Sequence, residues 1–172
     1  MTLLHQFKND YFISYAVVDD EKAAGVETGW VSNLKLSLEC ELSKAIGRRG
    51  QLEGFWDRAD IARNRPLESQ IREALRSTAV FVLVLSPGYL NSPWCPQELQ
   101  WFREAVATQP RADSRIFVVD LGSVTEAERR RRFEGYLSYS FYESDKDGRR
   151  RLLGYPEPDP KRHPAYYDSV MT

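Results

Sequence analysis

The residue of this chain with the clearest chemical potential is Glu98. Trp94 lies four positions before it, and Trp101 and Phe102 follow it at three and four positions. On a helix this spacing puts the carboxylate inside an apolar stripe near the helix N-terminus. A carboxylate beside an indole at the edge of a crevice can stabilise positive charge that develops in a substrate. Glycoside-bond cleavage, with its oxocarbenium-like transition state, is one such chemistry.

A structural role for Glu98 is also open. Pro96 is favourable at the first position of a helix, which makes Cys95 the expected N-cap and Glu98 the third helical residue. A glutamate at that position commonly accepts a hydrogen bond from the backbone N–H of the cap and interacts favourably with the helix dipole. Spacing alone does not separate this role from the catalytic one.

Other catalytic and cofactor motifs are missing from the sequence. His5 and His163 lie at opposite ends, and Cys40 and Cys95 are far apart, which leaves little for a Ser/His/Asp triad or a metal site. Neither GxxxxGK[ST] nor GxGxxG occurs. A phospho-receiver needs an aspartate after its third strand, where this chain has residues 85–87, Leu-Ser-Pro. We therefore expect neither a metal nor a resident cofactor.

The elements that must position Glu98 alternate between strands and helices. Apolar and β-branched runs predict strands at 11–15, 55–56, 80–85, 116–119 and 136–142. Apolar spacings of three and four predict helices at 30–46, which Gly47 and Gly50 end, and at 67–75, 94–106 and 125–133. This alternation predicts an α/β fold: a flavodoxin-like five-stranded parallel sheet with helices on both faces.

The place of a binding site follows from that fold. The continuous apolar run 80–85 should be the central strand, because it is suited to burial on both faces. Sheets of this kind bind ligands at the carboxyl ends of their strands, so the loops after Tyr15 and Leu85 should line the crevice. Residues 57–66 form a polar connection longer than the roughly 2 to 6 residues usual in such folds, which makes it a candidate functional loop.

Composition argues against several classes of protein. The 172 residues include 24 basic and 25 acidic ones, a balance that argues against a protein held to nucleic acid by bulk electrostatics. The longest apolar run, 79–85, is far shorter than the roughly 20 residues of a membrane span, and the N-terminus lacks the apolar region of a secretory signal. Two cysteines fit a reduced cytoplasmic location. The arginine runs 129–132 and 149–151 are interpreted as solvated faces or intramolecular contacts.

The C-terminal part of the chain differs in composition from the rest. Four of the nine prolines lie within 156–164. We expect a domain core at 8–142 and, at 143–172, a last helix or linker toward a domain that this chain does not contain. The alternative is a natural C-terminus that packs as an irregular cap.

Several stretches together resemble the Toll/interleukin-receptor (TIR) domain family. They are Tyr11-Phe12-Ile13-Ser14-Tyr15, Phe55-Trp56-Asp57, Leu75-Arg76-Ser77, the run from Val84 to Leu90 and the run from Ser92 to Leu99. The resemblance covers residues 8–142, and its specificity lies in the combination rather than in one motif. The pair Trp94 and Glu98 resembles the bacterial and plant-like members more than the animal receptor adaptors. The family's fold is the flavodoxin-like sheet expected above.

The resemblance implies an activity and a site. Many bacterial and plant members hydrolyse NAD at the nicotinamide–ribose bond to nicotinamide and ADP-ribose or a cyclic form of it, without a metal, and their catalytic glutamate matches Glu98. The substrate-binding residues implied with it are Tyr15, Ala16, Phe55, Trp56, Asp57, Arg58, Ser86 and Trp94. The loop that opens at Phe55 departs from the family, because Asn64 stands where a glycine is usual and Pro66 lies near the loop's end.

The resemblance also implies partners. An NAD-cleaving member would be activated by self-association of TIR domains and would serve as the effector of a bacterial immune or stress protein, joined to a sensor or oligomerisation domain. One alternative is a scaffold without enzymatic activity that recruits other TIR domains. Another is a virulence factor that binds TIR adaptors of a host.

Overall fold

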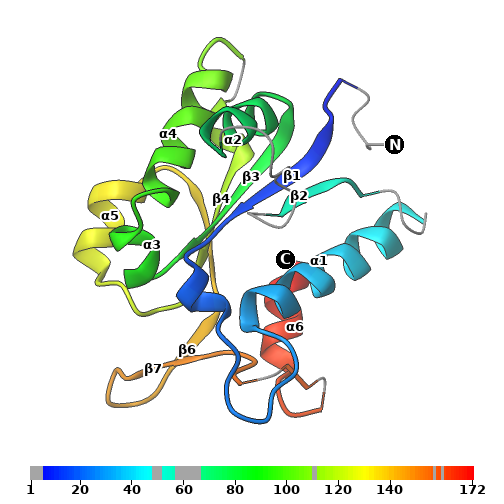
Figure 1. Cartoon of the computed structure of the whole chain (residues 1–172). Helices are drawn as coiled ribbons and strands as arrows, with labels where there is room; N and C mark the ends of the chain where they lie inside the picture. The colour runs from blue at the N-terminus through cyan, green and yellow to red at the C-terminus, as the bar shows by residue number, and fades with distance from the viewer. Residues whose placement is uncertain (1–5, 48–51, 57–66, 110–111, 157, 160) are drawn as a thin grey trace.

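The structure, a computed structural model of the whole chain, describes residues 6–47, 52–56, 67–109, 112–156, 158–159 and 161–172. Within these residues, one parallel sheet has the strand order β2-β1-β3-β4-β5 (Figure 1). Its strands are β1 (Asn9–Ser14), β2 (Gly54–Trp56), β3 (Thr78–Leu85), β4 (Ile116–Asp120) and β5 (Leu137–Ser140). This order confirms the predicted flavodoxin-like sheet and places the apolar run 80–85 in its central strand.

Helices cover both faces of the sheet (Figure 1). On one side lie α2 (Leu67–Arg76), α3 (Pro87–Asn91), α4 (Cys95–Val106) and α5 (Glu126–Phe133), and on the other lie α1 (Trp30–Ile46) and α6 (Pro164–Met171). Short 3-10 helices occur at η1 (Val17–Asp20) and η3 (Ala112–Arg115). The predicted helices are confirmed, and α3 is an addition that the sequence patterns did not indicate. Among the described residues, no helix has the length and apolar character needed to cross a bilayer.

Aromatic stacking joins three strands to α4 on the first face of the sheet. Phe12 of β1 stacks on Phe55 of β2 and on Phe81 of β3, with ring centroids 5.2 and 5.6 Å apart. Phe81 in turn stacks on Phe102 of α4 at 5.2 Å. Such pairs contribute about 0.5–1.5 kcal/mol each beyond the burial of their area. This stack fixes the position of α4, the helix that carries Glu98, against the central strands.

The C-terminal segment completes the second face. Trp30 of α1 meets Tyr166 of α6 edge to face at 6.1 Å, and Tyr166 meets Phe141 at 5.9 Å. The indole N–H of Trp30 donates a hydrogen bond to the carbonyl of Leu153 at 2.8 Å. The segment 143–172 therefore packs into the second hydrophobic cluster through α6.

The last predicted strand is shorter than expected. The run 136–142 ends its pairing with β4 at Ser140, and Tyr142 begins a separate antiparallel hairpin of β6 (Tyr142–Ser144) and β7 (Arg150–Leu152). The chain turns at Phe141, whose N–H donates to the carbonyl of Asp120 and whose carbonyl accepts from Leu153. These two bonds join the end of β4 to the residue that follows β7, and so connect the sheet to the hairpin. The alternating pattern of the sequence does not reveal these long-range bonds.

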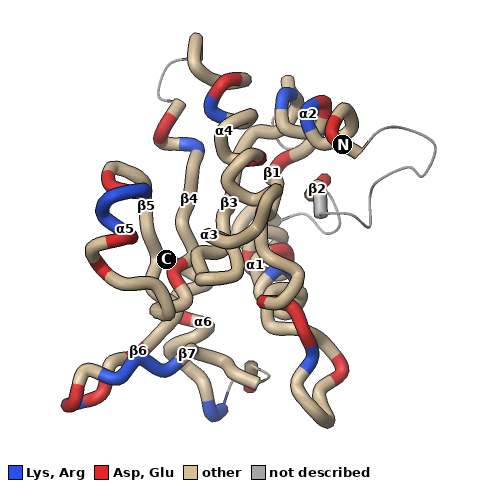
Figure 2. The backbone as a smooth tube through the Cα atoms, turned by 60° about the vertical axis from the view of Figure 1, so that its left-hand side comes forward, with Lys and Arg blue, Asp and Glu red and all other residues tan. Residues whose placement is uncertain are grey.

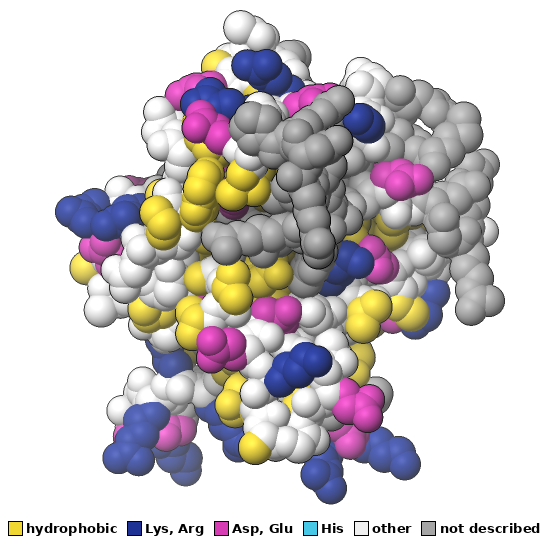
Figure 3. Space-filling view, viewed as in Figure 1, with side chains coloured by type: hydrophobic (Ala, Val, Ile, Leu, Met, Phe, Trp, Pro, Cys, Tyr) yellow, Lys and Arg dark blue, Asp and Glu magenta, His cyan; other side chains and the backbone are white. Residues whose placement is uncertain are grey.

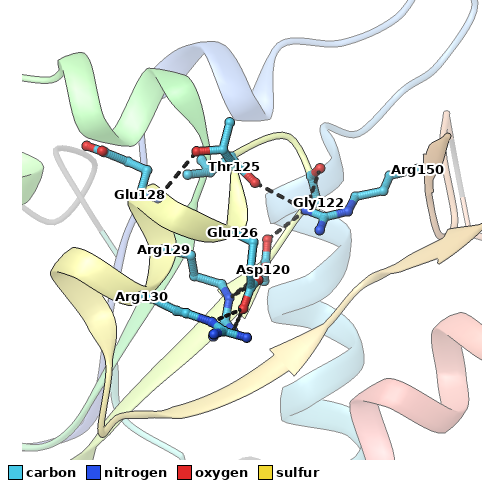
Figure 4. Close-up of polar contacts among 9 residues, drawn as sticks. Asp120, Gly122, Thr125, Glu126, Glu128, Arg129, Arg130 and Arg150 are labelled. Carbon is cyan, nitrogen blue, oxygen red and sulfur yellow. Dashed lines mark hydrogen bonds and ion pairs between the residues drawn. The ribbon is translucent and has the colours of Figure 1, made fainter. Parts of the chain in front are cut away.

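One arginine ties the hairpin to the end of β4. The guanidinium of Arg150 donates to the carbonyls of Gly122 and Val124 at 3.3 and 3.1 Å and lies 4.6 Å from the ring centroid of Tyr142. Beside it, the carboxylate of Asp120 accepts a 2.8 Å hydrogen bond from the N–H of Gly122 (Figure 4). Burial raises the pKa of Asp120. Arg150 thus has an intramolecular role, as expected for this arginine run.

The other arginine run forms ion pairs within α5, where Figure 2 shows basic and acidic positions along the helix and Figure 4 draws the pairs of Arg129 and Arg130 with Glu126. Arg129 and Arg130 pair with Glu126 at 2.6 and 2.7 Å, and Arg131 and Arg132 pair with Glu128 at 3.0 and 2.7 Å. The hydrogen bonds from Arg129 and Arg130 lower the pKa of Glu126 to about 2. The spacing of three and four positions explains why these pairs form along the helix surface.

The buried ring of Tyr166 gives a test of the C-terminal segment. We expect Tyr166→Ala to lower the free energy of unfolding by about 3–5 kcal/mol, because it removes a large aromatic group from a closed cluster. Chemical denaturation measures the change. Tyr155→Ala is the control, because that ring is 53% exposed and its loss should change stability by less than about 0.5 kcal/mol. Equal stabilities of wild type and Tyr166→Ala would contradict the packing of α6.

Candidate active site

A cavity of about 350 Å³ lies at the carboxyl ends of β1 and β3, the switch point where the strand order changes direction. Its lining comes from the residues after β1, from α3 and the turn that follows, and from the first turns of α2 and α4. The lining residues are Tyr15, Ala16, Val17, Val18, Leu67, Ile71, Gly88, Asn91, Ser92, Trp94, Cys95 and Glu98. Ligands of α/β sheets bind at such points. The residues after Tyr15 line the cavity as predicted, whereas after Leu85 the chain enters α3, and Gly88 and Asn91 of that helix line it in place of the expected loop.

A larger groove of about 1110 Å³ lies elsewhere, beside β7 and the residues that lead into α6. Its walls include Val26, Arg151, Arg162 and Pro164. No described residue that the sequence analysis assigned to the site lines this groove. Because the cavity at the switch point contains the candidate carboxylate, it is the better candidate for the active site.

Helix α4 begins one residue earlier than its proline predicts. Cys95 is the first helical residue and Trp94 is the N-cap, so the expectation that Cys95 is the cap is wrong. The hydroxyl of Ser92 accepts hydrogen bonds from the N–H groups of Trp94 and Cys95, both at 3.2 Å. Ser92 therefore caps the N-terminus of α4 although it lies outside the helix. The backbone N–H of the N-cap residue, Trp94, donates to Ser92, a partner other than Glu98.

The carboxylate of Glu98 is held inside the domain by β1. The residue is 6% exposed and faces the cavity. Its Oε2 accepts a 2.6 Å hydrogen bond from the hydroxyl of Ser14, the last residue of β1. A buried carboxylate is costly unless it is hydrogen-bonded. The arrangement supplies that bond and still leaves Glu98 in the cavity wall, where a carboxylate can stabilise a cationic group.

Three other residues expected at the site share the cavity with Glu98. Tyr15 and Ala16 follow β1 directly, and Trp94 stands at the start of α4. Tyr15 also packs against the second hydrophobic cluster and Trp94 against the first. The fold therefore brings Tyr15, Ala16, Trp94 and Glu98 together from two separate parts of the sequence.

Of the site residues expected in β2 and the loop that follows it, the structure describes the side chain of Phe55 alone, and Phe55 does not line this cavity. Phe55 packs against Phe12 within the core and lines a different cavity, near the amino ends of β1 and β2. The backbone of Trp56 pairs with β1. Asp57 and Arg58, like the rest of the loop 57–66 with Asn64 and Pro66, lie outside the described residues.

Ser86, also expected to bind substrate, lies behind the cavity wall. Its hydroxyl accepts a 2.9 Å hydrogen bond from the N–H of Tyr89, which makes it the N-cap of α3. The same hydroxyl donates to Asp19 Oδ2 at 2.6 Å. Ser86 does not line the cavity. It connects η1, which forms one wall, to α3, which forms another.

Sequence reasoning missed several members of this cavity. Leu67 and Ile71 of α2 line it, although their helical spacing indicated only a core-facing side. Val17 and Val18 line it and are each 56% exposed. Figure 3 shows hydrophobic side chains at the surface of the face that carries α3 and α4 in Figure 1. Ser14 was also missed, although a polar residue at the end of an apolar strand was a signal that could have found it.

The described part of the chain contains no group of three or more histidine, cysteine, aspartate or glutamate side chains that could hold a metal ion. Among the described lining residues, the cavity offers one carboxylate beside aromatic, aliphatic and small polar side chains. Such a site suits the stabilisation of positive charge on a bound organic substrate.

The pair of Ser86 and Asp19 gives a test of the cavity wall. Burial raises the pKa of Asp19 above its ordinary value of 3.8, and the hydrogen bond from Ser86 opposes that shift. The ordinary value of 3.8 applies to Asp19 in the unfolded chain, and the raised pKa applies to the folded protein. At pH values between the two, the folded state binds more protons than the unfolded state, so the free energy of unfolding falls as pH rises. Asp19→Asn keeps an oxygen acceptor for Ser86 and removes the charge. We expect wild type to lose stability relative to this variant as pH rises from about 3.8, and then to keep a constant difference, in denaturation at several pH values. A difference that is the same at every pH would contradict this prediction.

Known proteins resemble this chain in sequence family and in fold. The family model of the TIR domain matches residues 12–153. One similar solved structure is that of the TIR domains in the activated Roq1 resistosome, which directly recognises the pathogen effector XopQ. It has 19% sequence identity and a TM-score of 0.51, and the match covers 72% of this chain and 63% of the Roq1 chain. Another is the TIR domain of the Toll-related receptor TRR-2 from Hydra magnipapillata, with 18% identity, a TM-score of 0.49 and coverage of 76% and 84%.

No curated protein matches the chain. The Roq1 likeness, at its low sequence identity, concerns the fold alone, and this chain spans less than two thirds of the Roq1 chain's length. The family match is of a different kind, because it covers most of the sequence and includes the carboxyl end of β1, the cavity and α4. On that match, the chain belongs to the TIR domain family.

Proposed function

We propose that this TIR domain cleaves the bond between nicotinamide and ribose in NAD, with Glu98 as the catalytic residue. One observation carries the proposal: a buried carboxylate, bonded to Ser14, forms part of the wall of a cavity at the switch point of the sheet. Some members of the family hydrolyse NAD, which agrees with this chemistry. Tyr15 and Trp94 supply aromatic surface beside the carboxylate.

The proposed reaction breaks the bond between ribose C1′ and the ring nitrogen of nicotinamide. The electron pair of this bond leaves with nicotinamide, which departs as a neutral molecule and needs no proton from an acid. Positive charge develops on the ribose, and the carboxylate of Glu98 lies where it can stabilise that charge and hold the ribose hydroxyls. Water then attacks C1′ and releases a proton, which gives ADP-ribose. Attack by an adenine nitrogen instead gives a cyclic product.

The size of the cavity determines which part of NAD it can hold. Its volume of about 350 Å³ is near the lower end of the range of roughly 300–1,000 Å³ found for ligand pockets. We assign the cavity to the nicotinamide riboside half. The ADP half then extends from the mouth of the cavity along the surface.

We also propose that activity depends on self-association. The mouth carries two exposed aliphatic side chains, Val17 and Val18, in the wall of the cavity itself. The Roq1 structure contains TIR domains within an assembled resistosome. A second TIR domain over these valines would remove apolar surface from water and close the part of the site that holds ADP.

The first prediction of this proposal concerns Glu98. Glu98→Gln keeps the size of the side chain and removes the charge, so we expect NAD cleavage to fall by at least about 100-fold. Chromatography of nicotinamide and ADP-ribose measures it over a wide range of protein concentration. The control is Glu104→Gln, an exposed glutamate later in the same helix, which should cleave NAD at the wild-type rate.

The outcomes separate an enzyme from a scaffold. Cleavage by wild type that is lost only in Glu98→Gln supports the enzyme. No cleavage by wild type at any concentration, with the domain also tethered on a surface to force assembly, would overturn the proposal in favour of a scaffold. Equal cleavage by wild type and Glu98→Gln would show that another residue is catalytic.

The second prediction concerns the mouth of the cavity. The double variant Val17→Lys with Val18→Lys places two like charges where a second copy would pack, so the protein concentration for half-maximal activity should rise by about tenfold, or about 1.4 kcal/mol. Leu36→Lys on α1 is the matched control, because Leu36 has the same 56% exposure and does not line the cavity. An equal shift in both variants would contradict an interface at the mouth.

A further inference from the structure

We infer that Ser14 is a positioning residue for Glu98: its hydroxyl holds the carboxylate in the cavity wall in the orientation and charge state that cleavage requires. This inference rests on the proposed function. It assigns a role to a residue that does not line the cavity. Ser14 therefore acts through Glu98 rather than through contact with NAD.

The geometry of β1 makes Ser14 a rigid donor. Its backbone pairs with Leu83 in the central strand, and its side chain is 1% exposed. A serine hydroxyl in a strand has one side-chain torsion to fix, whereas the carboxylate of a glutamate has three. The 2.6 Å bond from Ser14 to Oε2 thus joins the longer, more flexible side chain of Glu98 to a strand that is paired within the sheet.

The bond also affects the charge on Glu98. A hydrogen bond donated to a carboxylate favours its charged form, and burial favours the neutral form. Among the residues that the structure describes, the titratable groups that face Glu98 are Tyr15 after β1, Tyr89 in α3 and Cys95 at the start of α4. Burial raises the pKa of Tyr89 far above its ordinary value. Tyr89 is therefore neutral at neutral pH and does not supply a competing charge.

The test is Ser14→Ala in an NAD-cleavage assay at a fixed protein concentration. We expect kcat to fall by about ten- to hundredfold, because the carboxylate loses its fixed orientation. KM should stay within about twofold, since Ser14 does not touch the substrate. The acid side of the profile of kcat against pH should move to higher pH, because the carboxylate is protonated more easily without the bond.

A matched control separates positioning from stability. Thr78→Val also removes a buried hydroxyl, one that donates a 2.7 Å hydrogen bond to the carbonyl of Ala74. Thr78 is the first residue of β3, whereas Ser14 pairs with Leu83 near the carboxyl end of that strand, beside the cavity. It should lower folding stability and leave kcat and the pH profile unchanged. A Ser14→Ala variant with the kcat and pH profile of wild type would overturn the inference. So would a Thr78→Val variant whose kcat and pH profile change as much as those of Ser14→Ala.

A second readout does not depend on activity. Carbon-13 NMR of labelled glutamate carboxyls, with the Glu98 signal identified by its loss in Glu98→Gln, gives the titration midpoint of Glu98 in wild type and in Ser14→Ala. A midpoint that rises in Ser14→Ala supports the inference, and an unchanged midpoint overturns it. If wild type cleaves no NAD, the proposed function fails, and the midpoint still decides whether Ser14 controls the charge of Glu98.

Discussion

The pairing of β1 with β3 is the constraint on which the rest of this domain depends. β3 is apolar along its length, so it must lie at the centre of the sheet, buried on both sides. With β1 beside it, the strand order changes direction between the two, and their carboxyl ends diverge into separate loops. The cavity forms between those loops. The end of β1 supplies both the first residues of its wall and the serine that bonds Glu98.

The aromatic stack on the first face transmits this constraint to α4. Phe12 and Phe81 lie side by side on the two central strands, and Phe102 packs on Phe81 from the helix. Because Glu98 and Phe102 are one helical turn apart, the packing of Phe102 fixes the depth at which the carboxylate lies. Core packing and the candidate chemistry are thus properties of the same helix face.

The second face depends on the C-terminal segment. Tyr166 closes an aromatic cluster with Trp30 and Phe141, while Arg150 binds the hairpin to the loop after β4. These contacts lie away from the cavity. They stabilise the sheet from the side opposite to α4, so that the loops at the switch point are carried by a sheet packed on both faces.

The order of the elements, the central place of the run 80–85 and the end of α1 at Gly47 all follow from local patterns in the sequence. Apolar periodicity and a glycine in the left-handed conformation are local signals, and they specify local structure. The sequence also pointed to Glu98 as a candidate site residue, because a carboxylate within an apolar stripe is unusual wherever the stripe packs. The surroundings of that carboxylate, in contrast, become known only from the folded chain. Ser14 lies 84 positions from Glu98 in the sequence, and the spacing of nearby residues does not indicate the bond between them. The same spacing does not indicate that Phe55 and Ser86 lie outside the cavity wall. Hydrogen bonds and packing between distant segments depend on how strands and helices are arranged in space. A periodic pattern specifies a single strand or helix and the side of it that is buried, but it does not specify which distant element that side contacts.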